Sequence, residues 1–372
     1  KLLLIAALGN ATPFWDQWDG EAAGLYLPYL NGTLDAEQLF AAHNEHCIAV
    51  TRIYDLLLLE VAGEWDPRLQ MVANALLHVA MLTFYVWLLL PLVAAPRRLF
   101  VVAVAALVFA LPLGWEDTLA GFQSQFYFAL LFSLGAIAAL AGAPAFTRRW
   151  CFGLLSLGLA GLSMASGALA VAVTIGLCAL QQGVGVRDRT VREWAALGLL
   201  FGLGGVLFAC VPHVPEHDAL RAASLWEFSG AIVELAALPY ATVAGVVVMH
   251  APLFWLGWRV LRDRPGRGHA AGITLGAGAL VAAHIVSLAY GRGRHVMGSR
   301  YLDTVALAYP IDLALLLLAA DGNSRRRLTR VAALLWIGCF VAAIAAVGYY
   351  ASLRGAMRRG ALAEIQQQNV TA

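Results

Sequence analysis

Four short polar runs interrupt an otherwise apolar chain, and the first of them follows its N-terminal apolar residues. This run contains Trp15, Asp16, Trp18, Asp19 and Glu21. A carboxylate at Asp16 or Asp19 can act as a general base towards a hydroxyl or amine acceptor. Trp15 and Trp18 offer flat faces on which a sugar ring can stack. The alternative interpretation is an aromatic anchor at a membrane surface, surrounded by solvated acids.

The second run is His43-Asn44-Glu45-His46. Two His residues three positions apart can share one helix face and bind a divalent metal there. The run lacks the HExxH order that pairs two metal ligands with a base. Acid–base work by Glu45 or the His residues, and hydrogen bonds to a substrate, are therefore equally open roles. A divalent metal ion bound by His43 and His46 is therefore one candidate cofactor. The structural alternative is the polar end of a helix at the membrane surface.

The third run is also acidic and contains Glu116 and Asp117, with Gln123 following a few residues later. We expect this run on the same side of the membrane as Asp16 and Asp19. Acids from two loops would then converge on one outer cavity as catalytic residues, with Gln123 among the substrate-binding side chains. The alternative is that these acids begin a helix and complement its dipole.

The fourth run is basic and contains Arg292, Arg294, Arg300 and Tyr301. Arg is the preferred partner of phosphate, because its planar guanidinium bonds two oxygens at once. We expect Arg300 to lead the binding of a lipid-linked phosphate or pyrophosphate, with Tyr301 as a hydrogen-bonding partner. Contacts with lipid headgroups, or pairing with the acidic loops, are the alternatives.

The composition indicates the class of fold that must position these runs. Hydrophobic residues make up 61% of the chain and charged residues 13%, whereas soluble domains carry about 25% charged residues. The apolar runs are continuous rather than alternating, which favours helices over a barrel. We predict an all-α, polytopic transmembrane bundle of about 10–11 helices. The predicted segments are 1–8, which we expect to continue upstream of Lys1, 69–92, 99–113, 126–143, 151–165, 167–180, 195–211, 238–258, 270–290, 304–320 and 331–350.

The distribution of Arg predicts the topology. By the positive-inside rule, Arg clusters mark the cytoplasmic side, and all of them share one side only if 151–180 is two helices broken at 163–167. Gly and Ser are typical of such a break. The clusters are Arg97 and Arg98; Arg148 and Arg149; Arg187, Arg189 and Arg192; Arg262, Arg264 and Arg267; and Arg325, Arg326, Arg327 and Arg330.

The remaining connections then form the outer side. These are the loops 9–68, 114–125, 212–237 and 291–303, together with a short outer tail at 351–372. We expect residues 1–350 to form a single transmembrane domain. In its first outer loop, 9–68, the segments 34–42 and 48–61 are predicted to be amphipathic helices lying along the membrane surface.

In its layout the chain resembles the GT-C superfamily of membrane glycosyltransferases. The shared features are a long first outer loop, acids after the first and third helices, and a late outer loop that contains Arg. The runs Trp-Asp-Gln-Trp-Asp, His-Asn-Glu-His, Gly-Phe-Gln and Ser-Arg-Tyr look like those of bacterial members of this group. By that resemblance Asp16 or Asp19 is the base and Arg300 holds the carrier phosphate. The Asp-x-Asp pattern of metal-dependent members is absent, which leaves metal dependence open.

The resemblance implies transfer of a sugar from a polyprenyl-phosphate carrier to a glycan, lipid or protein acceptor. The protein would lie in the bacterial inner membrane among membrane lipids, with its active site facing the periplasm or exterior, and would have no nucleic-acid partner. The alternative function is a transporter or flippase of a lipid-linked saccharide, which would need a polar path through the bundle.

Overall fold

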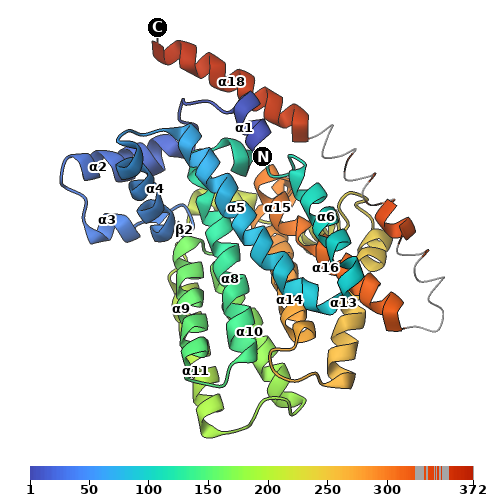
Figure 1. Ribbon diagram of the computed structural model, residues 1–372. Helices are drawn as coiled ribbons and strands as arrows, with labels where there is room; N and C mark the ends of the chain where they lie inside the picture. Colours follow the sequence, from blue (N-terminus) through green and yellow to red (C-terminus); the bar gives the residue numbers. More distant parts are fainter. Residues whose placement is uncertain are drawn as a thin grey trace.

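The computed structural model describes residues 1–322, 331, 334–338, 340, 342, 345 and 352–371. This part of the chain is helical almost throughout and contains one two-stranded sheet (Figure 1). The predicted all-α helical bundle is confirmed. The predicted segment 331–350 and the Arg cluster at 325–330 lie largely or wholly outside the described residues.

Six helical segments of the described chain are long and apolar enough to cross a membrane: Pro67–Leu92, Gly121–Gly142, Val191–Ala209, Val243–Asp263, Ala270–His295 and Ser299–Asp321. The chain therefore has the helices of an integral membrane protein. The helices of the bundle are α5 Pro67–Leu89, η2 Leu90–Leu92, α6 Ala95–Ala110, α8 Ser124–Gly142, α9 Arg148–Ser163, α10 Gly167–Gly183, α11 Val191–Ala209, α13 Val243–Asp263, α14 Ala270–Arg292, α15 Ser299–Ala306 and α16 Ala308–Gly322.

The remaining elements gather mainly at one end of the bundle, at the top of Figure 1. They are α1 Leu2–Leu8, η1 Gln17–Tyr26, α2 Leu27–Leu30, α3 Ala36–Phe40, β1 Ala42–His43, β2 His46–Cys47, α4 Ala49–Ala62, α7 Trp115–Leu119, η3 Gly121–Gln123, η4 Pro215–Leu220, α12 Leu225–Ala236, η5 Gly293–His295 and α18 Arg354–Thr371. The C-terminal helix α18 packs against α1 and α7 at this end.

The first outer loop has less helix than its sequence suggests around the two His residues. Helices α3 and α4 lie near the predicted segments 34–42 and 48–61. Between them, however, His43 and His46 pair across the antiparallel β1–β2 hairpin instead of sharing a helix face. Asn44 takes a left-handed backbone conformation, with φ of 51°, and lets the chain reverse in two residues.

The predicted break after α9 is confirmed. Helix α9 ends at Ser163, and α10 starts at Gly167. A Cβ at Gly167 would lie 2.1 Å from the carbonyl oxygen of Ala160, so only glycine fits where the chain turns back on itself. The intervening residues 164–166 therefore reverse the chain at the same end as the first outer loop.

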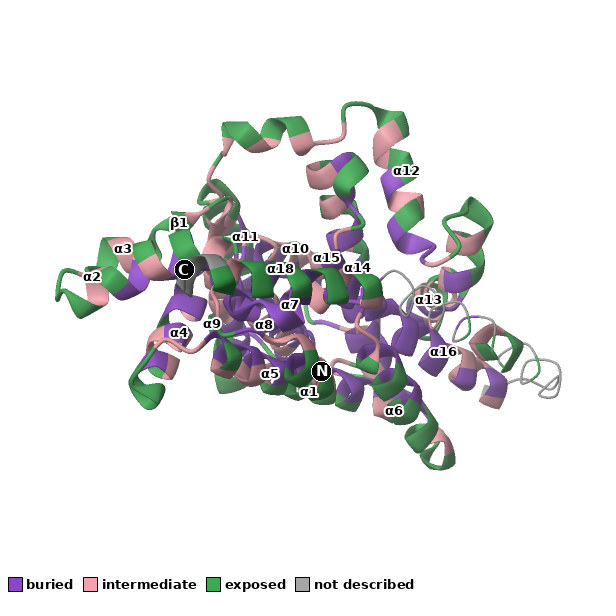
Figure 2. Cartoon of the chain, turned by 90° about the horizontal axis from the view of Figure 1, so that it is seen from above, coloured by how far each residue is buried: buried purple, intermediate pink, exposed green. Residues whose placement is uncertain are grey.

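All four predicted outer loops contain helical segments, among them one longer helix in each of the two later loops. Helix α12 lies within 212–237, and α15 begins within 291–303 and runs on almost directly into α16. The segment between α11 and α12 swings away from the bundle before the chain returns through α12, as the view from above shows (Figure 2). Asp303, expected in a loop, is 4% exposed and bonds to Lys1 Nζ at 2.9 Å.

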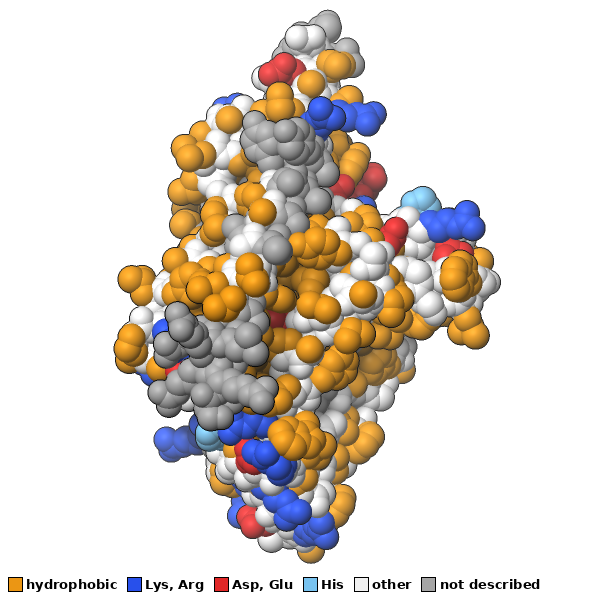
Figure 3. Space-filling view, turned by 90° about the vertical axis from the view of Figure 1, so that its right-hand side faces the viewer, with side chains coloured by type: hydrophobic (Ala, Val, Ile, Leu, Met, Phe, Trp, Pro, Cys, Tyr) orange, Lys and Arg blue, Asp and Glu red, His pale blue; other side chains and the backbone are white. Residues whose placement is uncertain are grey.

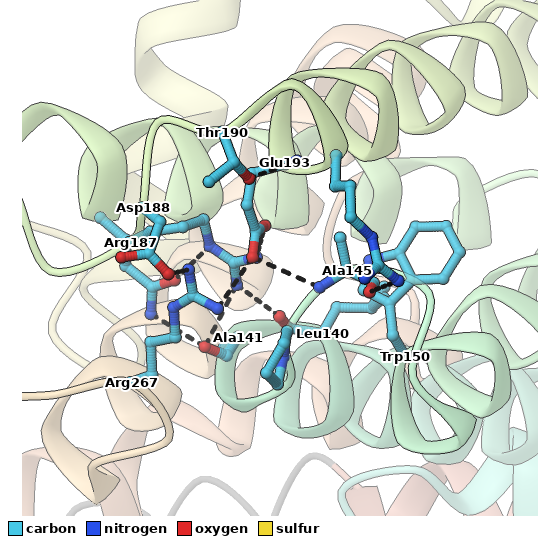
Figure 4. Close-up of polar contacts among 12 residues, drawn as sticks. Leu140, Ala141, Ala145, Trp150, Arg187, Asp188, Thr190, Glu193 and Arg267 are labelled. Atoms are coloured by element: carbon cyan, nitrogen blue, oxygen red, sulfur yellow. Dashed lines mark hydrogen bonds and ion pairs between the residues drawn. The ribbon is translucent and has the colours of Figure 1, made fainter.

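Arg side chains gather at the opposite end of the bundle. Figure 3 shows hydrophobic side chains over the middle of one face and Arg side chains at its lower end. Arg97 pairs there with Asp321 at 2.9 Å, linking α6 to the end of α16. The α10–α11 and α13–α14 connections meet around Glu193 at this same end (Figure 4).

Glu193 is the centre of this Arg-rich end. Its carboxylate pairs with Arg187 at 2.8 Å and with Arg267 at 2.8 Å. Arg187 also donates to the carbonyl oxygen of Leu140 at 2.7 Å, which ties in the end of α8. Glu193 and Arg187 are both buried, so each charge depends on the other for compensation.

We predict that Glu193→Ala destabilises the fold by about 3–5 kcal/mol, because it leaves two guanidinium groups without their shared carboxylate. The measurement is SDS-induced unfolding in mixed micelles. Asp188→Ala is the matched control: its carboxylate also touches Arg267, but its side chain is 78% exposed, so we expect a loss below about 1 kcal/mol. Equal losses in the two variants would contradict this account.

Candidate functional site

A polar cavity of about 500 Å³ lies at the end of the bundle that carries the first outer loop. Its walls come from that loop, from η3 and the start of α8, from residues 164–166, from the end of α11 and from the 291–301 segment. Eight residues singled out in the sequence line it: Asp16, His43, Glu45, His46, Gln123, Arg292, Arg300 and Tyr301. The cavity therefore joins residues from both ends of the chain.

Asp16 stands directly before η1 and faces the imidazole of His43, whose Nε2 lies 3.6 Å from its carboxylate. The contact with His43 and the more distant guanidinium of Arg300 hold the pKa of Asp16 below its ordinary value, against the effect of burial. Asp16 is thus a carboxylate at neutral pH. His43 packs edge-on against Phe122, and Gly20 leaves room for both rings because a Cβ there would lie 2.7 Å from Phe122.

Glu45, at the tip of the β1–β2 hairpin, lines the cavity and contacts two other segments of the chain. It lies 2.5 Å from Nδ1 of His217 in η4 and accepts from Arg292 at 3.5 Å. Burial alone would raise the pKa of Glu45, but His217 and Arg292 together lower it. Burial lowers the pKa of His46 to about 4, so that ring is neutral at physiological pH.

Arg300 forms no ion pair with any carboxylate of the described residues. Its guanidinium lies over the ring of Tyr301, 5.6 Å from the ring centre, and its Nε is buried without a hydrogen-bond partner among the described residues. Arg292 lies nearby and donates through Nε to the hydroxyl of Tyr301 at 3.0 Å. Two guanidinium groups and a phenol thus form the wall that suits an anion.

Glu116 lies behind this wall and does not line the cavity. Its carboxylate accepts from the backbone N–H of Arg300 at 2.9 Å and from the hydroxyl of Ser299 at 3.0 Å. Its own backbone N–H donates to Ser299 Oγ at 3.1 Å. Glu116 therefore fixes the start of α15, the helix that carries Arg300.

The other predicted site residues lie outside the cavity. Asp19 is exposed on η1. Trp15 and Trp18 are also exposed: Trp15 stacks on Phe14, and Trp18 meets Trp65 edge to face. The side chain of Arg294 is 85% exposed, and its nearest described acid is Glu227 at 3.6 Å.

Asp117 is 1% exposed and does not line the cavity. Burial, with the Asp303 carboxylate nearby, raises the pKa of Asp117 well above its ordinary value. Its surroundings therefore favour the neutral form of this carboxyl group. Of the four acids predicted to converge, only Asp16 lines the cavity, and Glu116 supports it from behind.

Several cavity residues were not singled out from the sequence. Gln125 lines the wall next to Gln123, to which its amide donates at 3.1 Å, and its own carbonyl oxygen has no described partner. Ser166 lines the cavity from the α9–α10 break. The Gln-Ser-Gln run was visible in the sequence, but an amide has no charge pattern that distinguishes a cavity wall from a buried helix start.

The described residues contain no group of three or more His, Cys, Asp or Glu side chains placed to hold a metal ion. His43 and His46 oppose each other on the hairpin, and Asp16 approaches only His43. We therefore assign no step to a metal.

Comparison of the chain with protein-family models, curated proteins and solved structures gave no match.

We predict that Glu116→Ala lowers stability by about 1–3 kcal/mol, because the buried N–H of Arg300 and the hydroxyl of Ser299 lose their acceptor. Glu116→Gln keeps one oxygen and should lose less. The measurement is again unfolding in mixed micelles, with Glu64→Ala, which removes an exposed carboxylate, as the control. A Glu116→Ala protein as stable as the control would remove Glu116 from the support of Arg300.

Proposed function

We propose that this protein is a membrane glycosyltransferase that moves a sugar from a polyprenyl-phosphate carrier to an acceptor at its non-cytoplasmic surface. The observation that carries the proposal is that one cavity contains both the ionised carboxylate of Asp16 and the guanidinium of Arg300, which has no described counter-ion. A transfer of this kind needs a base for the acceptor and a cation for the leaving phosphate.

The chemical step is a direct displacement at the anomeric carbon. Asp16 takes the proton of the acceptor hydroxyl or amine as the acceptor oxygen or nitrogen bonds to that carbon. The bond from the anomeric carbon to the phosphate oxygen breaks, and the electron pair leaves with the phosphate. His43 lies next to Asp16 and orients its carboxylate. Its imidazole can also form a hydrogen bond with the acceptor substrate.

Arg300 and Arg292 bind the phosphate as negative charge develops on it. Arg300 is free for this role because no described carboxylate pairs with it, whereas Arg292 is oriented by Tyr301 and Glu45. A preorganised cation of this kind stabilises the transition state without reorganising during the reaction.

An apolar groove next to the cavity supports a lipid-linked donor. It encloses about 670 Å³ between α10, α12 and α14, and shares Leu169 and Ser287 with the polar cavity. Leu225, Val286 and Tyr290 line the groove and are exposed, as suits side chains that face lipid. A carrier phosphate near Arg300 could thus place its polyprenyl chain along this groove.

The orientation follows from the two ends of the bundle. The Arg-rich end around Glu193 would face the cytoplasm by the positive-inside rule, which places the cavity on the periplasmic or external side. The resemblance to the GT-C superfamily agrees with this arrangement and suggests the inner membrane of a bacterium, with a glycan, lipid or protein as acceptor.

We predict that Asp16→Asn lowers kcat by about 10²–10⁴-fold, because the acceptor loses its general base. Asp19→Asn is the matched control on the same short segment and should keep kcat within about threefold, since Asp19 lies outside the cavity. The assay follows sugar transfer from a polyprenyl-phosphate-sugar in proteoliposomes. Donor that crosses the bilayer chemically unchanged, with no transfer, would indicate a flippase instead.

We predict that Arg300→Ala weakens the binding of polyprenyl phosphate by about tenfold or more, as expected for a charge-assisted hydrogen bond. Arg300→Lys should lie between, because an ammonium cannot bond two phosphate oxygens in a plane. Arg294→Ala removes an exposed guanidinium from the same segment and should bind as the parent does. Binding is measured with purified protein, and equal affinities for the Arg300 and Arg294 variants would exclude the phosphate role.

A further inference from the structure

A network of buried polar side chains lies behind Asp16, outside the cavity. Glu21 of η1 and Asp55 of α4 are both 0% exposed and lie within hydrogen-bonding reach of each other. Gln70 of α5 connects them: its Nε2, which carries two hydrogens, lies 2.5 Å from Glu21, 2.9 Å from the hydroxyl of Tyr26 and 3.4 Å from Asp55. Three elements of the first outer loop and bundle thus meet at two carboxyl groups.

The directions of the hydrogen bonds in this network are fixed by groups that can only donate. The backbone N–H of Phe14 donates to Oε1 of Gln17 at 3.0 Å, and the indole N–H of Trp65 donates to Oε1 of Gln70 at 3.3 Å. Both amide nitrogens must therefore point towards the carboxyl groups. Gln17 donates to Glu21 at 2.8 Å and to Gln70 at 3.1 Å.

A hydrogen bond between the two carboxyl groups requires one proton between them, because two carboxylates offer acceptors only. Both oxygens of Glu21 already accept from amides, while Oδ2 of Asp55 has no partner among the described hydrogen bonds. Two ionised carboxylates in contact and out of water would repel each other strongly. The pair therefore holds at least one proton at neutral pH.

The network reaches Asp16 through Gln17. Trp15, the residue before Asp16, has φ of 48°, a left-handed conformation that is strained for a bulky side chain. This turn is closed twice by Gln17: its backbone N–H donates to the carbonyl of Phe14 at 3.1 Å, and its side chain accepts from the N–H of Phe14. The position of the Asp16 carboxylate in the cavity thus depends on the orientation of Gln17.

We propose that Glu21 and Asp55 are positioning residues for Asp16, and that their shared proton keeps Gln17 in the orientation that closes the Phe14–Gln17 turn. The assignment of Asp16 as the group they position rests on the proposed transferase function; the shared proton itself does not.

No charged group of the described chain compensates the pair. The faces packed against it contribute the amides of Gln17 and Gln70, the indole of Trp65 and the phenol of Tyr26, and Tyr54 directly precedes Asp55 on α4. Burial raises the pKa of Tyr54 to about 12 and that of Tyr26 further, so both stay neutral. Arg52 of α4 donates instead to the carbonyl of Leu39.

The pair should therefore make stability depend on pH. Burial raises the pKa of Glu21 to about 7 from 4.5, and raises that of Asp55 well above its ordinary value. A carboxyl whose pKa is higher in the folded state stabilises the fold fully below its unfolded pKa and loses that contribution as pH rises through the folded value. Stability should thus fall from about pH 5 through neutrality into the alkaline range.

The test compares Asp55→Asn with Asp55→Ala. An Asn keeps the acceptor for Gln70 and replaces the shared proton by a permanent N–H donor to Glu21, with the same net charge as the singly protonated pair. Between about pH 6 and pH 9, the thermal midpoint of Asp55→Asn in detergent should fall by less than half as much as that of the parent. Glu60→Gln, which removes an exposed carboxylate from the same helix, should leave the parental pH dependence unchanged.

Activity provides the second readout. Asp55→Ala should lower kcat by about tenfold or more through displacement of Asp16, with polyprenyl-phosphate binding unchanged, and Asp55→Asn should restore kcat at neutral pH and keep it at alkaline pH. Equal pH–stability profiles for the parent and Asp55→Asn, or a parental kcat in Asp55→Ala, would overturn the proposal. Absence of sugar transfer in the parent would instead refute the proposed function, and the stability profiles alone would then decide on the shared proton.

Discussion

The reversal of the chain between α9 and α10 is the constraint on which the assembly of the cavity depends. Each membrane helix carries the chain to the opposite end of the bundle, so the number of helices between two loops decides whether they can meet. If 148–183 were one continuous helix, every later loop would change ends. Arg292 and Arg300 would then lie with the Arg-rich loops, far from Asp16. The tight turn at Gly167, which has no room for a Cβ, therefore makes the site possible as well as the fold.

The two ends of the bundle differ in how their Arg side chains are paired. Around Glu193, buried Arg side chains are matched by a shared carboxylate and by backbone carbonyl groups, so the cluster has little capacity left for a ligand. In the cavity, Arg300 has its backbone fixed by Glu116 but its guanidinium left without a described counter-ion. The guanidinium of Arg300 is half-buried, so it differs from the paired Arg187 in both its burial and its lack of a described counter-ion.

Periodicity and charge were enough to predict most of the fold. Continuous apolar runs indicated the bundle, and the requirement that Arg clusters share one side predicted the break at 163–167. The same parity brought Asp16 and Arg300 to one end. Local structure could not be predicted in the same way. The hairpin at His43 and His46 depends on the left-handed backbone of Asn44. A spacing of three residues between two His side chains fits a helix face equally well. A helical period also does not reveal that α12 and α15 lie within connections.

The roles of individual acids were hidden for a different reason. In the sequence, Asp16, Asp19, Glu21, Glu116 and Asp117 are equivalent carboxyl groups near a membrane surface. Their chemistry diverges only through their surroundings: Asp16 faces His43 and a guanidinium, Glu116 accepts from a helix start, and Asp117 and Glu21 are withdrawn from water.

Burial therefore sorts these acids by protonation state, and only a carboxyl group that is both ionised and open to the cavity can act as a base at neutral pH. Among the acids of these two outer runs, Asp16 alone meets both conditions, with Asp19 exposed but outside the cavity. The buried carboxyl pair behind Asp16 then follows the same logic. In the proposed reaction, the carboxylate of Asp16 stays open to the cavity, where no shared proton can fix its position. Its rigidity therefore depends on buried neighbours, namely the carboxyl pair of Glu21 and Asp55.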